Sequence, residues 1–147
     1  MDRNQLETLP TEISQLTSLR RLDLTNNQLK ELPTALFQLQ RTITTLYLKG
    51  NQLEELPSEI FRLTALEELD LSNNQLKKLP AEVDQLTALM GLNLSGNQLE
   101  ELDLSRYGGS PLLLVQRGAH FHARSNREFK LPRARADVAD RSWLDRT

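Results

Sequence analysis

One tripeptide recurs through the first part of this chain at a nearly constant spacing. Asn-Gln-Leu begins at five asparagines, Asn4, Asn27, Asn51, Asn74 and Asn97, and the intervals are equal except for one extra residue in the second. The dipeptide Leu-Pro keeps the same spacing, and its prolines are Pro10, Pro33, Pro57 and Pro80. Such a repeat predicts stacked copies of one structural unit, because a single short unit cannot bury its own apolar residues.

The spacing of the leucines predicts the structure of each unit. The third full unit follows the pattern L-x-x-L-x-L-x-x-N-Q-L-x-x-L-P-x-x-[ILV]-x-x-L over residues 66–86. Leu69 and Leu71 are two residues apart, which places both side chains on one face of a short strand. Pro80 favours the start of a turn or short helix, and Val83 and Leu86 follow at helical spacing. The pattern predicts an α/β solenoid with parallel strands on its concave face and short helical or 3₁₀ segments on its convex face.

This pattern resembles the leucine-rich repeat family, in its short form of about 23 residues with the convex half L-P-x-x-[IL]-x-x-L. It is similar to the repeats of bacterial effectors and other bacterial repeat proteins, of Ras-binding scaffold proteins, and of domains attached to Roc-COR GTPases. The resemblance covers about residues 1–102. It identifies the fold but no ligand, because the matching residues are the structural ones.

The repeated asparagines are interpreted as structural residues and not as a binding site. In this family, the side chain that follows the strand turns inward and hydrogen-bonds the backbone of neighbouring turns, as a buried polar group requires. The extra residue of the second interval fits residues 40–43, where Ile43 takes the leading leucine position. We expect the connecting loop to absorb it at little entropic cost.

The repeat fails after Leu102, and the composition changes there. Residues 1–102 carry a net charge of −6, whereas residues 103–147 carry +4 and hold eight arginines. We therefore expect two regions. Residues 1–102 form a solenoid of about four to five repeats, and residues 103–147 form a C-terminal cap and a poorly ordered or loosely docked Arg-rich tail. The apolar run of residues 112–115 is the candidate for a final strand.

The chain starts within a repeat, because Asn4 corresponds to Asn27 and most of the first strand is missing. Either residues 1–16 cap the solenoid or the chain is a piece of a longer protein. No apolar run reaches the roughly 20 residues that span a bilayer, and the first residues lack the apolar core of a secretory signal. We expect a cytoplasmic location, or export without a cleaved signal peptide.

The exposed strand positions are the candidate binding surface. On each predicted strand, the residues between and beside the two leucines face the concave solvent side, and they vary while the leucines repeat. The candidate partner-binding residues are Arg21, Asp23, Tyr47, Lys49, Glu68, Asp70 and Asn93. A purely structural interpretation stays open, since tyrosine is a good strand former and charges keep an exposed sheet soluble. We expect a non-catalytic module that binds a protein partner, as a monomer or a weak homodimer.

The sequence holds no motif that indicates catalysis or a cofactor. A P-loop and a Gly-x-Ser-x-Gly elbow are absent. The lack of cysteine excludes disulfide caps, thiolate metal sites and the cysteine-dependent ubiquitin ligase domain that accompanies similar repeats in some bacterial effectors. Two alternatives remain open. The chain is the substrate-recognition fragment of a larger enzyme, of the ubiquitin ligase or Roc-COR GTPase type, or it is a repeat fragment without a dedicated ligand.

Two further binding chemistries are weaker interpretations. His120 and His122 alternate as two metal ligands on a strand would, with Glu128 as the nearest acidic third ligand, but two surface imidazoles explain the pair more simply. The arginines and aromatic residues of the tail resemble a nucleic-acid-binding composition. The acidic repeats would repel phosphate, so we do not expect nucleic acid as a partner.

Overall fold

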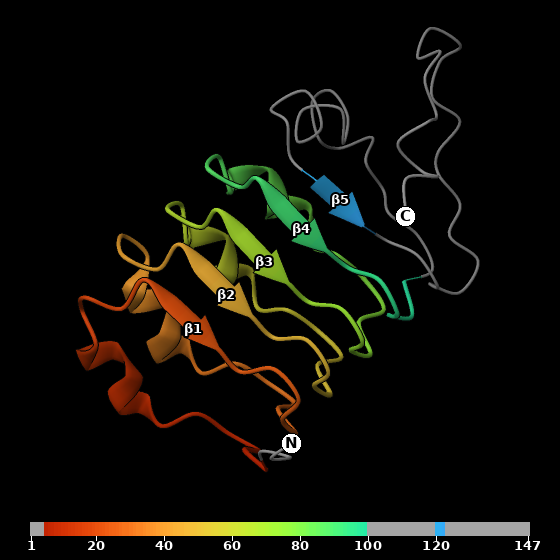
Figure 1. Cartoon of the computed structure of the whole chain (residues 1–147), viewed down its shortest axis with the longest axis horizontal. Helices are drawn as coiled ribbons and strands as arrows, with labels where there is room; N and C mark the ends of the chain where they lie inside the picture. Colours follow the sequence, from red (N-terminus) through yellow and green to blue (C-terminus); the bar gives the residue numbers. More distant parts are fainter. Residues whose placement is uncertain (1–4, 100–119, 123–147) are drawn as a thin grey trace, which may run out of the picture.

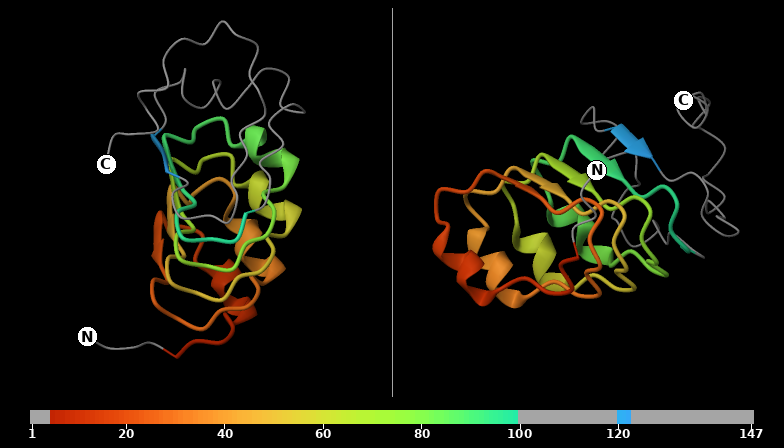
Figure 2. Two further views of the ribbon diagram at one scale, coloured as in Figure 1. Left: turned by 90° about the vertical axis from the view of Figure 1, so that its right-hand side faces the viewer. Right: turned by 60° about the horizontal axis from the view of Figure 1, so that its bottom comes forward.

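Each repeat makes one turn of a solenoid in the computed structural model, which describes residues 5–99 and 120–122. The described strands form one parallel sheet in chain order (Figure 1). They are β1 Arg21–Asp23, β2 Thr45–Tyr47, β3 Glu68–Asp70, β4 Gly91–Asn93 and β5 His120–His122. The helical segments are all 3₁₀ helices: η1 Thr11–Gln15, η2 Thr34–Leu39, η3 Ser58–Arg62 and η4 Ala81–Gln85. Figure 2 shows the strands along one side of the turns and the 3₁₀ helices along the other, as the sequence predicted.

Each 3₁₀ helix begins directly after the proline of its repeat. The four prolines have φ between −69° and −59° and ψ between 142° and 148°, an extended conformation from which the chain turns into the helix. Three of the helices close in the same way. The N–H of Leu63, for example, donates to the carbonyl of Ile60 at 3.1 Å. The Leu-Pro signal therefore sets where the convex segment starts, and the next two apolar residues set where it ends.

The extra residue of the second interval is absorbed around η2. This helix has 6 residues, whereas η1, η3 and η4 have 5 each. Gln40 then keeps a right-handed helical conformation, with φ −57° and ψ −22°. Ile43 is still fully buried. The insertion therefore stays in the convex-to-concave connection, as predicted, and leaves Arg41 exposed.

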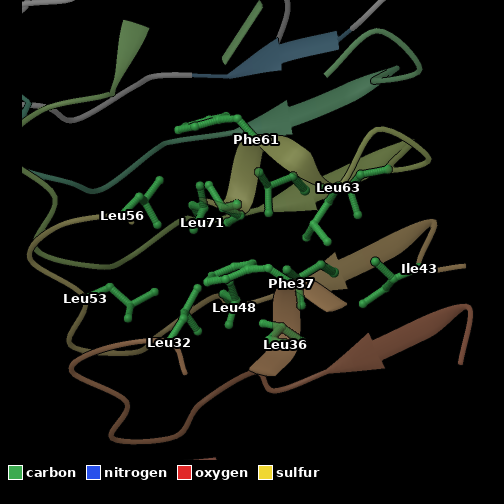
Figure 3. Close-up of a cluster of buried hydrophobic side chains, with 14 of the residues drawn as sticks. Leu32, Leu36, Phe37, Ile43, Leu48, Leu53, Leu56, Phe61, Leu63 and Leu71 are labelled. Carbon is green, nitrogen blue, oxygen red and sulfur yellow. The ribbon is translucent and has the colours of Figure 1, made fainter. Parts of the chain in front are cut away.

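A continuous apolar core fills the space between the sheet and the 3₁₀ helices (Figure 3). The middle leucines of the strands lie in register, and Leu46, Leu69 and Leu92 are at most 2% exposed. Leu22 holds the same position on β1 but is only half-buried, because β1 is the edge of the sheet. Phe37 and Phe61 add volume on the helical side.

Buried asparagines join neighbouring turns of the backbone. The side-chain nitrogen of Asn51 donates to the carbonyls of Leu24 and Leu48, both at 2.9 Å, and its oxygen accepts from the N–H of Leu29 at 3.1 Å. Asn74 and Asn97 repeat this pattern one and two turns further on. The side chains of Asn27, Asn51, Asn74 and Asn97 are 4% to 6% exposed. Their predicted structural role is confirmed.

The last described strand lies further along the chain than the repeat spacing implies. Gly91 on β4 is in register with His120 on β5. One more repeat with the spacing of Glu68 to Gly91 would instead have paired Gly91 with Leu114, within the predicted final strand. That predicted strand, residues 112–115, lies outside the described residues. The predicted division into residues 1–102 and 103–147 stays a prediction, since most of the second region also lies outside them.

Candidate functional site

Two rows of side chains run across the concave face, one at each end of the strands. Register aligns the first row as Arg21, Thr45, Glu68 and Gly91, and the second row as Asp23, Tyr47, Asp70 and Asn93. Every one of these residues is exposed or half-buried. The backbone register on β5 pairs His120 with Gly91 and His122 with Asn93. The structure thus brings six of the seven candidate residues into two rows, and the seventh, Lys49, is exposed two positions after Tyr47.

Three of these side chains form a connected cluster across three neighbouring strands. The guanidinium carbon of Arg21 lies 4.7 Å from the centre of the Tyr47 ring. The hydroxyl of Tyr47 donates a hydrogen bond to Glu68 Oε2 at 2.5 Å. A cation over an exposed aromatic ring contributes about 0.5–1 kcal/mol. Arg21 and Glu68 therefore favour one orientation of the Tyr47 ring, which lowers the entropy that a partner would have to remove.

The other members of the second row have a local structural role. Asp23, Asp70 and Asn93 each accept a hydrogen bond from the N–H two residues later, an Asx turn that ends the strand. The donors are Thr25, Ser72 and Ser95, at 3.0, 2.9 and 3.1 Å. The hydroxyl and the amide of Thr25 together lower the pKa of Asp23, and the nearby Arg21 lowers it further. Sequence reasoning missed this role, although the triplet [DN]-L-[ST] recurs at all three turns.

The backbone conformation restricts which residue type can precede each buried asparagine. Asn26 and Asn73 have positive φ angles of 57° and 54°, and Gly50 and Gly96 have φ angles of 68° and 70°. Asparagine and glycine are the residues that adopt this left-handed conformation most readily. A Cβ atom on Gly50 would also clash with Asn26 Oδ1. The alternation between asparagine and glycine at these positions therefore has a steric cause, and it is not evidence that they bind a partner.

A shallow hollow of about 310 Å³ lies beside the cluster, between β2 and β4. We call it the concave hollow, and its lining includes Tyr47, Glu68, Asp70, Met90, Gly91 and Asn93. Met90 is 58% exposed, whereas most large apolar residues in the described part of the chain are buried. A Cβ on Gly91 would lie at an ordinary van der Waals distance of 3.9 Å from Glu68 Cγ, so the absence of a side chain at Gly91 leaves more space in the hollow. The hollow therefore combines an apolar wall with two carboxylates.

The carboxylates of the concave hollow have no basic partner in the described part of the chain. The hydrogen bonds of Glu68 and Asp70 go to the Tyr47 hydroxyl and the Ser72 amide. The ion pair found within residues 5–99 joins Lys77 to Glu54, at 2.9 Å and away from the hollow. A basic group of a partner could therefore pair with these two carboxylates without displacing a basic residue of the described chain.

The described residues contain no group of three or more His, Asp or Glu side chains that could hold a metal ion. Glu128, which sequence reasoning paired with the two histidines, lies outside these residues. The interpretation of His120 and His122 as surface imidazoles therefore stays a prediction.

The contact with Glu68 predicts the titration of Tyr47. The hydrogen bond to Glu68, together with burial and the negative charge of that carboxylate, raises the pKa of the Tyr47 phenol. A raised pKa in the folded state means that this interaction stabilises the fold at neutral pH. It is lost as the pH rises through the folded value, in the alkaline range. We expect Glu68→Gln to lower the pKa of Tyr47.

Ultraviolet titration of tyrosinate measures this pKa, in a Tyr107→Phe background so that Tyr47 is the remaining one of the 2 tyrosines. Glu67→Gln is the matched control, because Glu67 is the adjacent exposed carboxylate and makes no hydrogen bond to Tyr47. Equal Tyr47 pKa values in the Glu68→Gln variant and its parent would contradict the cluster.

Comparison with known proteins identifies the family to which this architecture belongs. Family models described as leucine rich repeat match residues 18–39 and 41–99, which together make up more than half of the chain. The chain belongs to the leucine-rich repeat family. The sequence pattern predicted this family and its bacterial form, and the similar solved structures described next are bacterial.

Three solved structures share the leucine-rich repeat fold with this chain. A leucine-rich repeat protein of Leptospira interrogans is 34% identical, with a TM-score of 0.61, over 89% of this chain and 37% of its own. An internalin of Listeria monocytogenes is 26% identical, with a TM-score of 0.70, over 88% of this chain and 35% of its own. The functional domain of InlJ from Listeria monocytogenes is 28% identical, with a TM-score of 0.68, over 88% of this chain and 25% of its own. A search of curated proteins gives no match.

These relatives are much longer than this leucine-rich repeat chain, which spans between 25% and 37% of their length. The domain of InlJ includes a cysteine ladder. This chain has no cysteine, and buried asparagines join its turns instead. None of the helices in the described residues is long and apolar enough to cross a membrane. The expected cytoplasmic or exported location stays a prediction.

Proposed function

We propose that this leucine-rich repeat chain is a non-catalytic recognition module that binds a protein partner through the concave face of β1–β4. The observation that carries the proposal is the cluster of Arg21, Tyr47 and Glu68 beside an open hollow. Aromatic and arginine side chains are the commonest anchors of protein interfaces. Here both are exposed or half-buried on neighbouring strands, and they contact each other. The repeat fold itself is typical of protein-interaction modules.

The chemistry of the concave hollow favours a basic side chain of the partner. The stem of a lysine or arginine would lie along Met90 and Gly91, and its charged end would reach Glu68 and Asp70. Hydrogen bonds between ionised groups are about twice as strong as neutral ones. The net charge of −6 over residues 1–102 would also speed the approach of a basic partner.

Co-purification tests this proposal with a variant that keeps the structural residues of the face. The Tyr47→Ala, Glu68→Arg double variant removes the aromatic anchor and reverses one charge of the hollow. Asp70 is left unchanged, because its Asx turn supports the backbone. We expect a bound protein to be retained at least about tenfold less by this variant than by the native chain, which corresponds to about 1.4 kcal/mol.

The control is Gln38→Ala, Glu31→Arg, which truncates one exposed side chain and reverses the charge of one exposed carboxylate outside the hollow. Circular dichroism first establishes that all three proteins are folded. Mass spectrometry then compares the proteins that each one retains. A partner retained equally by both variants would place recognition elsewhere than the concave face. The absence of any specifically retained protein would favour the alternative of a repeat fragment without a dedicated ligand.

A further inference from the structure

A second hollow, of about 300 Å³, lies where η1 and η2 lead into β1 and β2. We call it the loop hollow. Its lining residues come from the two connecting loops, at 16–20 and 40–44, and they are Thr17, Ser18, Arg20, Arg41, Thr42 and Thr44. All six are polar or charged, in contrast to the mixed lining of the concave hollow.

The loop hollow holds two arginines that have no anionic partner in the part of the chain that the structure describes. Neither Arg20 nor Arg41 forms an ion pair or a side-chain hydrogen bond with a described residue, and both are exposed. Glu67, directly before β3, donates its N–H to the Thr44 carbonyl at 2.8 Å, but its side chain does not line the hollow. Two positive charges thus share one open space on a region of net charge −6.

The hydroxyl groups of the hollow fall into two classes. Thr42 and Thr44 donate their hydroxyl hydrogens to backbone carbonyls, at 3.3 and 3.2 Å. Thr17 and Ser18 make no such side-chain hydrogen bond within the described residues. Hydroxyl donors from Thr17 and Ser18 therefore remain available next to the two guanidinium groups.

One of the two arginines comes from the extra residue of the second interval. In the other described repeats, two residues separate the leucine that follows the 3₁₀ helix from the next leucine, as in Thr64-Ala65. The second repeat has three, and the extra length introduces Arg41. The position of Arg20 is occupied by Glu67 and Met90 in the third and fourth repeats. The paired arginines are therefore specific to the first two repeats and do not follow from the repeat pattern.

We propose that the loop hollow binds a tetrahedral oxyanion of the phosphate class, either free phosphate or the phosphomonoester of a modified side chain. Arginine guanidinium groups match the oxygens of phosphate with paired hydrogen bonds. A phosphate group offers three strong acceptor oxygens, and the hollow offers two guanidinium groups and two free hydroxyls. A carboxylate has two oxygens and would leave part of this donor set unused. The site is separate from the concave face, so it adds a ligand class to the proposed function.

Nuclear magnetic resonance titration of the ¹⁵N-labelled full chain tests this proposal, with inorganic phosphate as the probe and sodium chloride holding the ionic strength constant. We expect saturable shifts of amides in residues 17–20 and 41–44. Arg20→Gln and Arg41→Gln are each expected to weaken binding about tenfold, the loss of a charge-assisted hydrogen bond. The Arg20→Gln, Arg41→Gln double variant is expected to abolish saturation. Arg62→Gln, at an exposed arginine of η3 outside the hollow, is the matched control and keeps native affinity.

Two further arms define the ligand. O-phosphoserine that binds as tightly as phosphate assigns the hollow to a phosphomonoester, and phosphate that binds alone assigns it to the free ion. Acetate that shifts the same amides to the same extent would overturn the phosphate class. Shifts that rise linearly with phosphate, or that are unchanged in the double arginine variant, would overturn the site. The Tyr47→Ala, Glu68→Arg variant should bind phosphate normally, which separates this result from the test of the concave face.

Discussion

Replacing Asn51 with alanine is expected to destabilise the solenoid by about 3 kcal/mol, because a buried and fully bonded amide is lost. The side chain makes three buried hydrogen bonds, to the carbonyls of Leu24 and Leu48 and from the N–H of Leu29. Each carbonyl keeps a second asparagine donor, because Leu24 also accepts from Asn27 and Leu48 from Asn74. The Leu29 N–H keeps none, and a stranded buried donor costs about 1–3 kcal/mol. The remaining loss comes from the two bonds and the space that alanine leaves.

Urea denaturation followed by circular dichroism measures this loss. Gln75→Ala removes an exposed amide that follows another buried asparagine, and it should change the free energy of unfolding by less than about 0.5 kcal/mol. Equal free energies of unfolding for the Asn51→Ala variant and the native chain would contradict the asparagine ladder as a source of stability.

An Asn51→Asp variant separates hydrogen bonding from volume. The carboxylate keeps the shape of the amide but places negative charge against two carbonyl oxygens that now lack this donor. Burial raises the pKa of such an aspartate above its unfolded value. Its folding is therefore favoured at acidic pH and weakens as the pH rises through the unfolded pKa. We expect the stability gap between this variant and the native chain to widen from pH 4 to pH 7, and a constant gap would contradict the assignment.

The fold follows from the sequence because every unit repeats the same physical constraints. Leu69 and Leu71 alternate, Pro80 starts a 3₁₀ helix and Asn74 is buried, all as the spacing predicts. The extra residue near Arg41 was also placed correctly, since Ile43 restores the frame. The position of β5 was not predicted. A strand pairs through its backbone, and its sequence His-Phe-His carries none of the leucine pattern from which the others were read.

The candidate site is predicted only in outline. Alternation along a strand shows which residues are exposed, and register then brings Arg21, Tyr47 and Glu68 together. Alternation cannot show that Asp70 bonds its own backbone while Glu68 bonds a neighbouring strand. Those choices depend on side-chain reach across adjacent strands. The predicted partner-binding role, the oligomeric state and the alternative of a fragment of a larger enzyme stay predictions.

The second large effect that we expect is a loss of folding stability when a strand leucine is replaced by alanine, compared at two leucines in the same register position. Leu46→Ala is expected to cost about 3 kcal/mol, within the roughly 2–5 kcal/mol usual for a buried leucine that leaves a cavity. Leu46 is fully buried between β1 and β3. Leu22→Ala is expected to cost about 1 kcal/mol, because Leu22 is half-buried on the edge strand and already meets solvent. Both variants make the same chemical change on three-residue strands, so their difference isolates burial.

Urea denaturation at several protein concentrations measures both losses and also tests the predicted weak homodimer. In a monomer, the two losses differ by about 2 kcal/mol and neither depends on concentration. Equal losses for Leu22→Ala and Leu46→Ala would mean that something covers β1 in solution. If the loss for Leu22→Ala then grew with concentration, the cover would be a second copy of the chain, because only association makes stability depend on concentration. A large loss of stability for Leu22→Ala that does not depend on protein concentration would mean that another part of the same chain covers β1.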